Sequence, residues 1–76
     1  MRILVGTVSI PYDVAVIEVE QCIFDDDTWQ LIATVAGERY LIGDYDSEEK
    51  AVEEFAAITV EYERGTKTYH VYRGGK

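Results

Sequence analysis

The segment Tyr40–Arg64, YLIGDYDSEEKAVEEFAAITVEYER, joins a short extended run to an acidic helix start and to the one stretch with helical periodicity. On a helical wheel centred on Val52, apolar residues fall on one broad side and mostly charged residues fall opposite. The side that we expect to face the core holds Ala51, Val52, Phe55, Ala56, Ile58, Thr59 and Tyr62. The side that we expect to face water or a partner holds Lys50, Glu53, Glu54, Ala57, Glu61 and Arg64.

Both ends of this helix are marked by capping residues. Asp46 and Ser47 are good N-cap residues, and Glu49 follows Asp46 by three positions, as in a capping box. Gly65 marks the end, because glycine readily adopts the left-handed conformation that follows a last helical turn. The pattern predicts a helix over about residues 47–63.

The end of this stretch also fits a strand. Ile58, Val60 and Tyr62 alternate, and β-branched and aromatic residues favour strands. In that alternative, Arg64-Gly65 turns the chain back into the run KTYHVYR. The sequence favours the helix but leaves residues 58–63 open between the two.

The rest of the chain contains runs with strand periodicity, at residues 3–10, 14–24, 29–36, 39–42 and 66–73. A tight turn at Gly37-Glu38 makes 29–42 a hairpin, and Gly43 lets the chain leave the sheet. Together these runs predict an α+β fold, with a four- or five-stranded, mainly antiparallel sheet packed on one amphipathic helix. We expect a core in which Val52, Phe55, Thr59 and Tyr62 pack against Trp29, Leu31 and Val35.

Length and composition limit the class of protein. The 76 residues suffice for a single domain, 1–76, in which 74–76 are expected to be a frayed tail. Hydrophobic residues make up 47% of the chain, which is ordinary for a folded domain. The lone Cys22 excludes an internal disulfide and fits a reducing compartment. The chain has no signal-peptide pattern or long apolar run, so we expect a cytoplasmic protein without membrane contact.

Charge is distributed unevenly along the chain. Fifteen Asp and Glu residues outweigh seven Lys and Arg residues, for a formal net charge of −8. All fifteen acidic residues lie between Asp13 and Glu63, where only Arg39 and Lys50 are basic. Such a field repels nucleic acid and anionic membranes and attracts proteins with basic surfaces. The simpler explanation is that the charge only keeps the protein dispersed.

No catalytic motif stands out. A nucleophile and base pair would have to be Cys22 and His70, which are single residues in different predicted strands. The glycines occur singly at turns or in the tail, so no phosphate-binding glycine loop is present. We therefore expect a protein that is not an enzyme and needs no cofactor.

Two acidic clusters are candidates for a metal site. Asp25-Asp26-Asp27 lacks the glycine and the closing glutamate of a calcium loop. Asp44, Asp46 and Glu48 alternate, but the same residues are explained as the polar start of the helix. We expect no metal at either cluster.

Binding to another protein is the function class that remains. The chain has six tyrosines, whose large rings and polar tips suit interfaces, and Tyr12, Tyr45 and Tyr72 are expected to be exposed. The expected contacts lie on the charged helix face and at the helix start: Asp44, Tyr45, Asp46, Glu49, Glu53, Glu54 and Glu61. The expected partner is a protein with a basic surface.

The stretch from Trp29 to Tyr69, centred on GERYLIGDYDSEEKAVEEF, resembles the strand, turn and acidic-helix pattern of small orphan proteins from phages and mobile elements. Some of these proteins are anti-defence inhibitors, including certain anti-CRISPR proteins built as a small sheet plus a helix. The resemblance rests on pattern and carries over no functional residue. It implies an inhibitor that presents carboxylates to a basic groove where phosphates would otherwise bind.

Two functional hypotheses follow. In the first, the protein blocks a nucleic-acid-binding surface of a host complex, and reversal of Glu53 and Glu54 to Lys abolishes binding with little change in melting temperature. In the second, the protein is an assembly module that forms a homodimer through an exposed edge strand at residues 66–73.

Overall fold

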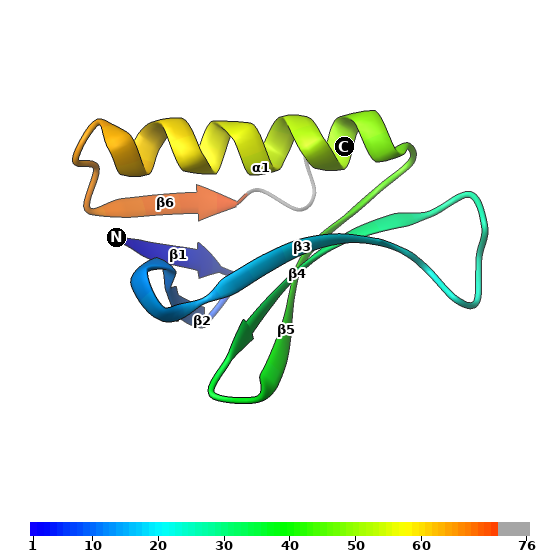
Figure 1. The fold of residues 1–76 in the computed structure, drawn as a ribbon, viewed down its shortest axis with the longest axis horizontal. Coiled ribbons are helices and arrows are strands. Elements are labelled where there is room, and N and C mark those ends of the chain that lie inside the picture. The colour runs from blue at the N-terminus through cyan, green and yellow to red at the C-terminus, as the bar shows by residue number, and fades with distance from the viewer. Residues whose placement is uncertain (72–76) are drawn as a thin grey trace.

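The computed structural model describes residues 1–71, which form an α+β fold (Figure 1). Its elements in chain order are β1 (Arg2–Val5), β2 (Val8–Pro11), the 3-10 helix η1 (Tyr12–Val14), β3 (Val16–Gln21), β4 (Trp29–Val35), β5 (Glu38–Tyr45), α1 (Glu48–Glu63) and β6 (Thr68–Val71). The predicted tail at 74–76 and the predicted exposure of Tyr72 lie outside the described residues.

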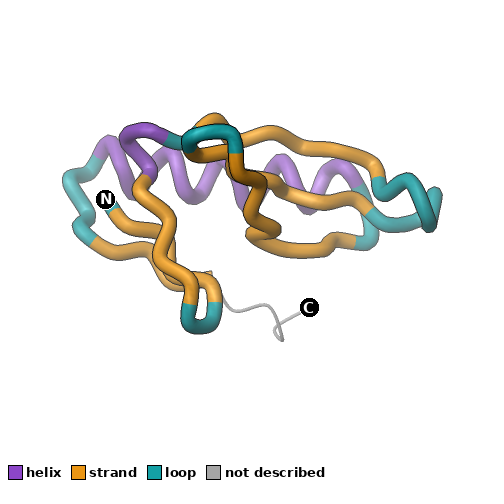
Figure 2. The backbone as a smooth tube through the Cα atoms, turned by 90° about the horizontal axis from the view of Figure 1, so that it is seen from below, coloured by secondary structure: helices purple, strands orange, loops and turns teal. Residues whose placement is uncertain are grey.

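The strands form two three-stranded sheets instead of the expected single sheet of four or five strands. In the first sheet, with order β2-β1-β6, β1 is antiparallel to β2 and parallel to β6. In the second, with order β3-β4-β5, both pairs are antiparallel. Helix α1 connects the second sheet to β6 and packs against β3, β4 and β5 of the second sheet (Figures 1 and 2). The expectation of mainly antiparallel strands and one helix is therefore confirmed, and the single sheet is wrong.

The expected strand over 3–10 is in fact a hairpin. Val5 pairs with Val8, and Gly6 and Thr7 form the two-residue turn between them. Gly6 has a φ of 61°, which is typical of the first position of a type II′ hairpin turn. The prediction was wrong because apolar residues continue on both sides of this turn, so the run looked like one strand.

The helix is confirmed, and residues 58–63 belong to it rather than to a strand. Its N-cap is Ser47, whose hydroxyl accepts a hydrogen bond from the backbone N of Lys50 at 3.2 Å. Asp46 does not cap the helix as the capping-box prediction required, since its carboxylate pairs with Lys50 Nζ at 3.2 Å.

The C-terminus of α1 ends in a Schellman motif. Gly65 has a φ of 85°, and its backbone N donates to the carbonyl of Tyr62 at 3.1 Å. The backbone N of Thr66 donates to the carbonyl of Glu61 at 3.0 Å. Gly65 therefore stops the helix as predicted and directs the chain into β6.

The core lies between the helix and both sheets. Its buried residues are Ile3, Val5, Ile10, Leu31, Ala33, Ile42, Ile58 and Val71. Each large aliphatic side chain in such a core contributes about 1.5 to 3 kcal/mol. Leu31 is buried as predicted, and Phe55 and Val35 pack at the edge of this cluster.

The buried face of α1 is centred on Ala51 and Ile58 and not on Val52. Val52 lies about 120° from Ile58 around the helix, and it is 49% exposed, while Tyr62 is 43% exposed. The wheel was misplaced because apolar residues of this helix occupy both its inner and its outer face. Small Ala51 is fully buried, which allows the sheet to approach the helix closely.

The predicted hairpin over 29–42 is present, but its turn is Ala36-Gly37 rather than Gly37-Glu38. Val35 pairs with Glu38, and Ala36 and Gly37 have φ values of 53° and 85°, as in a type I′ turn. Strand β5 also continues past Gly43 to Tyr45. Gly43 is buried there, and glycine is favoured because a Cβ atom at this position would lie 2.7 Å from the Tyr45 hydroxyl.

Candidate protein-binding surface

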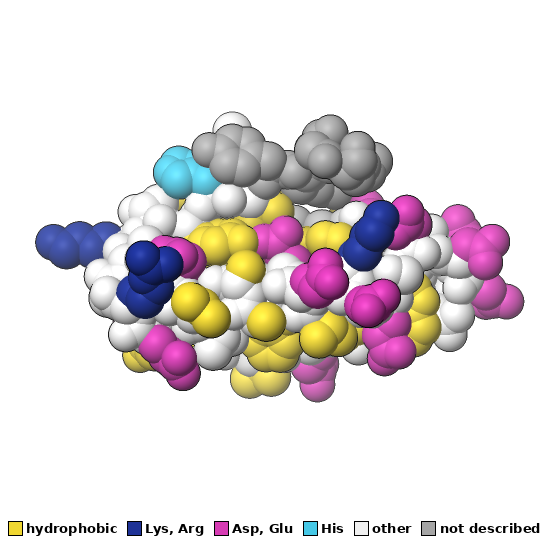
Figure 3. All heavy atoms as spheres, turned by 90° about the horizontal axis from the view of Figure 1, so that it is seen from above, with side chains coloured by type: hydrophobic (Ala, Val, Ile, Leu, Met, Phe, Trp, Pro, Cys, Tyr) yellow, Lys and Arg dark blue, Asp and Glu magenta, His cyan; other side chains and the backbone are white. Residues whose placement is uncertain are grey.

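Helix α1 carries four exposed glutamates, Glu48, Glu49, Glu53 and Glu63, that form no ion pair with another residue of the described 1–71. Carboxylates of this kind remain hydrated and available to a partner. The side of the molecule nearest α1 shows acidic side chains mixed with hydrophobic ones (Figure 3). The acidic surface predicted from the sequence is therefore interrupted by apolar groups.

The apolar groups on this side include Val52 and Val60, each 49% exposed, with exposed Ala56 between them. These residues follow one another at intervals of four, so they share a face of the helix. We define the outer helix face as the arc formed by Glu49, Val52, Glu53, Ala56, Val60 and Glu63. Exposed valines gain little from packing, and β-branched residues are weak helix formers. Helix stability therefore does not explain their presence here.

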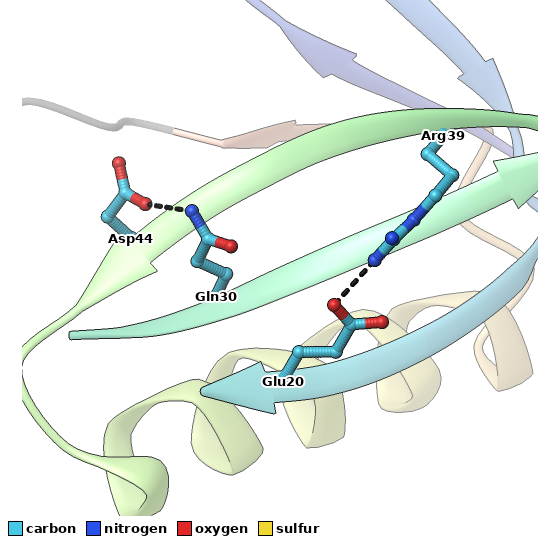
Figure 4. A network of polar contacts seen from close by, with 4 residues as sticks. All are labelled: Glu20, Gln30, Arg39 and Asp44. Atoms are coloured by element: carbon cyan, nitrogen blue, oxygen red, sulfur yellow. Dashed lines mark hydrogen bonds and ion pairs between the residues drawn. The ribbon is translucent and has the colours of Figure 1, made fainter. Parts of the chain in front are cut away.

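The start of the helix extends this acidic surface. Asp44, at the end of β5, accepts a hydrogen bond from Gln30 Nε2 at 3.2 Å (Figure 4). Asp46 is exposed and pairs with Lys50. Because exposed ion pairs contribute little to stability, the pairing of Asp46 leaves it able to exchange Lys50 for a partner's cation.

The same sheet carries a second polar pair, between Arg39 of β5 and Glu20 of β3 (Figure 4). The two side chains reach across the intervening strand β4, and both are partly exposed to solvent. This pair lies beyond the helix start and neutralises one carboxylate of the sheet. Other acidic side chains away from α1 are also exposed, namely Glu18, Asp25, Asp26, Asp27 and Glu38.

Glu54 and Glu61 do not belong to the outer helix face, although both were predicted as contacts. Glu54 is half-buried and accepts a hydrogen bond from the Tyr69 hydroxyl on β6. Glu61 accepts one from the Thr66 hydroxyl at 2.6 Å and pairs with Arg64 at 3.3 Å. Reversal of Glu54 would therefore disturb the fold as well as binding, so the double reversal of Glu53 and Glu54 cannot separate the two effects.

Tyr69 lies at this contact between α1 and β6. Burial of its ring, followed by its hydrogen bond to Glu54, raises the pKa of the Tyr69 phenol above its ordinary value. Burial and the hydrogen bond both favour the neutral phenol, because a phenolate there would be poorly hydrated and next to a carboxylate. Glu54 and Tyr69 are therefore parts of the fold rather than a free binding surface.

The predicted exposure of Tyr12 and Tyr45 is wrong, because both side chains are half-buried. Tyr12 is half-buried and stacks on Tyr62, with ring centroids 4.5 Å apart. The charge of Asp13, and then its hydrogen bond, raise the pKa of the Tyr62 phenol. Tyr45, a predicted contact, is half-buried, with its ring against Gly43. These rings mainly cover the edges of the core, as sheet and helix ends often require.

The two candidate catalytic residues, Cys22 and His70, lie on different parts of the fold. Cys22 follows β3 and is half-buried, whereas His70 is exposed on β6. Within residues 1–71, no three His, Cys, Asp or Glu side chains are grouped so that they would hold a metal ion. The single α-helix of this region is too short and too polar to cross a membrane.

Sequence reasoning missed the most exposed apolar residues of the described chain. Ile23 and Phe24 are 85% and 90% exposed, in the turn between β3 and β4. They were assigned to a strand over 14–24, but β3 ends at Gln21. The signal that was available is their position directly before Asp25-Asp26-Asp27, where a strand is unlikely to continue.

Comparison of the chain with protein-family models, with curated proteins and with solved structures found no match. The surface is therefore interpreted from its own geometry. That geometry contains exposed carboxylates on α1, exposed valines between them, and an apolar turn beside the helix start.

Proposed function

We propose that this protein is a non-enzymatic acidic module that binds a basic, nucleic-acid-binding surface of a host protein complex and blocks it. A phage-type inhibitor, such as an anti-CRISPR protein, works in this general way. The observation that carries the proposal is the outer helix face, where half-exposed Val52 and Val60 lie among exposed glutamates. Solubility alone accounts for the glutamates, but it does not account for the valines between them.

The spacing of charge on α1 supports a nucleic-acid-like surface. The helix has 16 residues and carries four exposed glutamates, so at 1.5 Å per residue it presents about one carboxylate per 6 Å of axis. One strand of DNA carries a phosphate about every 3.4 Å, and the duplex carries a charge about every 1.7 Å. The helix therefore resembles one strand more closely than a duplex, and the surface it suits is one that holds a single strand.

The valines give such a module an advantage over the nucleic acid itself. Binding that depends only on charge weakens steeply as the salt concentration rises. Apolar contacts made by Val52 and Val60 would persist at high salt, because burial of apolar surface does not depend on ion release. The module would then remain bound at salt concentrations that release the competing strand.

The proposal is tested by capture from a lysate of the source or host cells. The tagged protein is incubated with the lysate and nuclease at low and at high salt, and bound proteins are identified by mass spectrometry. We expect capture of a basic, nucleic-acid-binding complex. The double variant Glu49→Lys/Glu53→Lys should lose it, because both residues lie on the outer helix face.

A matched control separates this surface from net charge. The double variant Glu18→Lys/Glu38→Lys changes the charge equally, and both residues are exposed on strands rather than on α1. This control should keep the captured complex. Equal loss in both variants would show that only total charge matters, and equal retention would show that the helix is not the contact; either result contradicts the proposal.

A second candidate function is self-association through β6. Its support is that β6 is an edge strand of the β2-β1-β6 sheet and has exposed Thr68 and His70. A proline at Val71 is a poor test, because Val71 is 9% exposed and pairs with Val5 in the core. Sedimentation at rising concentration is the direct test, and a strict monomer at millimolar concentration rules this candidate out.

A further inference from the structure

The turn between β3 and β4, residues 22–28, projects at one end of the molecule (Figures 1 and 2). Ile23 and Phe24 in this turn are the most exposed large apolar side chains of the described residues, at 85% and 90%. We call these two residues the apolar tip. A phenylalanine can bury roughly 150 to 250 Å² of surface when it enters a pocket. The tip therefore has much to gain from a partner and contributes almost nothing to the core of its own chain.

The turn that carries the apolar tip is ordered by hydrogen bonds among its other residues. The Asp25 carboxylate accepts from the backbone N of Asp27 and from the Thr28 hydroxyl, each at 2.9 Å. The base of the turn is closed by the Cys22 backbone N, which donates to the carbonyl of Thr28 at 2.8 Å. Gln21 Nε2 adds a bond to the Asp26 carbonyl at 2.7 Å. A turn ordered in advance loses little conformational entropy when it binds.

The apolar tip lies toward the same end of the molecule as the acidic start of α1 (Figure 1). The ends of the strands are in register there, because Gln21 pairs with Trp29 and Trp29 pairs with Tyr45. The turn therefore leaves the sheet beside Asp44 and Asp46.

We propose that the apolar tip inserts into an apolar pocket edged by Lys or Arg side chains on the protein that the acidic surface binds. This inference rests on the proposed function and specifies the partner further. The basic surface of the partner contains a pocket next to the groove that binds α1. The basic edge is argued from charge, because Ile23 and Phe24 are followed directly by three aspartates that are all exposed. A buried aromatic anchor surrounded by polar contacts is the usual form of a binding hot spot.

Two other occupants fit the charges less well. An anionic membrane would attract Phe24 but would repel Asp25, Asp26 and Asp27. A second copy of the chain carries the same net charge of −8, so association would have to overcome that repulsion. A protein pocket with basic edges satisfies both the apolar side chains and the carboxylates.

The first experiment places a benzophenone-bearing phenylalanine at position 24 of the full chain and irradiates it in the lysate. The same group at position 60 reports on the outer helix face. Position 14 is the matched control, because Val14 is apolar and 65% exposed but lies in η1, away from the turn. We expect positions 24 and 60 to crosslink to one protein, and position 14 not to do so. The peptide linked to position 24 should combine apolar residues with Lys or Arg.

Each other outcome overturns the inference. A crosslink from position 60 but not from position 24 contradicts the proposed pocket and leaves the proposed function intact. No crosslink at either position removes both. A crosslink from position 24 to a second copy of this chain, to lipid or to a peptide without basic residues gives the tip a different occupant. Binding of the free protein to vesicles of phosphatidylcholine, with or without phosphatidylserine, assigns the tip to a membrane.

The second experiment measures the capture affinity of variants with the same partner. Phe24→Ser should weaken capture at least about 30-fold, as expected for a hot-spot residue. Val14→Ser should change it little, and both variants should keep the melting temperature within about 4 °C because both side chains are exposed. Unchanged capture by Phe24→Ser overturns the inference.

Two further variants separate the effect of the turn's charge on capture from the effect of its ordered conformation. Asp26→Asn/Asp27→Asn removes charge but spares the Asp25 carboxylate that orders the turn. It should weaken capture mainly at low salt, because the lost interaction is with basic side chains. Asp25→Ala removes the ordering bonds and should weaken capture at low and at high salt. Full capture by both variants would contradict a preordered, charge-edged tip.

Discussion

Helix α1 presents glutamates to two different surroundings. Glu54 and Glu61 face β6 and the turn before it, where the hydroxyls of Tyr69 and Thr66 bind them. Glu49 and Glu53 are exposed and form no ion pair with another residue of the described range. The same residue type, at the adjacent positions 53 and 54, therefore remains available for binding on one side and stabilises the fold on the other. Substitution of each set should affect one property and spare the other.

The largest effect is expected on the buried side of the helix. Ile58 is fully buried in the core, so Ile58→Ala should lower the free energy of unfolding by about 2 to 5 kcal/mol. Chemical denaturation followed by circular dichroism measures this loss. A domain of this size has little stability to spare. A loss below about 1 kcal/mol would mean that Ile58 is not part of a packed core.

The second effect compares neighbouring glutamates. Glu54→Ala removes the acceptor of the Tyr69 hydroxyl and should cost about 1 to 2 kcal/mol of unfolding free energy. Glu53→Ala removes an exposed carboxylate and should change it by no more than about 0.5 kcal/mol. Denaturant titration of the two variants gives the comparison. Equal losses of unfolding free energy in the two variants would contradict the distinction between the outer helix face and the side that faces β6.

The third effect depends on pH. The folded state raises the pKa of Tyr69, whereas a tyrosine in the unfolded chain titrates near pH 10. Above about pH 10 the native state holds more protons than the unfolded state, so stability should fall as pH rises. Below that pH both states are protonated and the full contribution is present. Thermal unfolding from pH 8 to 11 should show a shallower alkaline decline for Tyr69→Phe than for the native chain.

Tyr40, a half-buried tyrosine whose hydroxyl makes an exposed hydrogen bond, provides the control for this pH dependence. Tyr40 also has a raised pKa, because its hydroxyl donates to Glu38 and because the Glu38 charge disfavours a phenolate. Its hydrogen bond is exposed to solvent, so Tyr40→Phe should change the alkaline decline less than Tyr69→Phe. If Tyr40→Phe reduced the alkaline decline more than Tyr69→Phe, the ionisation that destabilises the fold at high pH would lie on β5 rather than between α1 and β6.

The smallest effect on stability is expected on the outer helix face. Val60→Ala should raise the free energy of unfolding slightly, by up to about 0.5 kcal/mol, because alanine is the better helix former. The same variant should weaken capture of the partner, since Val60 is one of the apolar groups available there. Denaturation and capture are measured on the same preparation. A clear loss of stability would mean that Val60 serves the fold.

The helix could be predicted because its signals are local. Ser47, the acidic first turn and Gly65 lie within or next to the segment that they define. The α+β class followed from that helix and from the strand periodicity around it. The turn at Gly6-Thr7 was missed because apolar residues continue on both sides of it. The parallel pairing of β1 with β6 joins the two ends of the described chain, and periodicity carries no information about such distant contacts.

The candidate surface could be predicted only in part. Charge identified Asp44, Asp46, Glu49 and Glu53 as exposed acidic residues, and the structure places them so. It could not distinguish these from Glu54 and Glu61, because that distinction depends on where β6 lies against the helix. The apolar tip was missed because Ile23 and Phe24 continue a strand-like pattern beyond the last paired residue.

Competition with nucleic acid tests the central claim most directly. The captured complex is purified, bound to a labelled single-stranded oligonucleotide, and titrated with this protein while fluorescence anisotropy reports release. We expect release by the native chain and by Glu18→Lys/Glu38→Lys, but not by Glu49→Lys/Glu53→Lys. If the oligonucleotide stays bound when the complex is saturated with the native chain, the acidic helix does not occupy the nucleic-acid-binding surface.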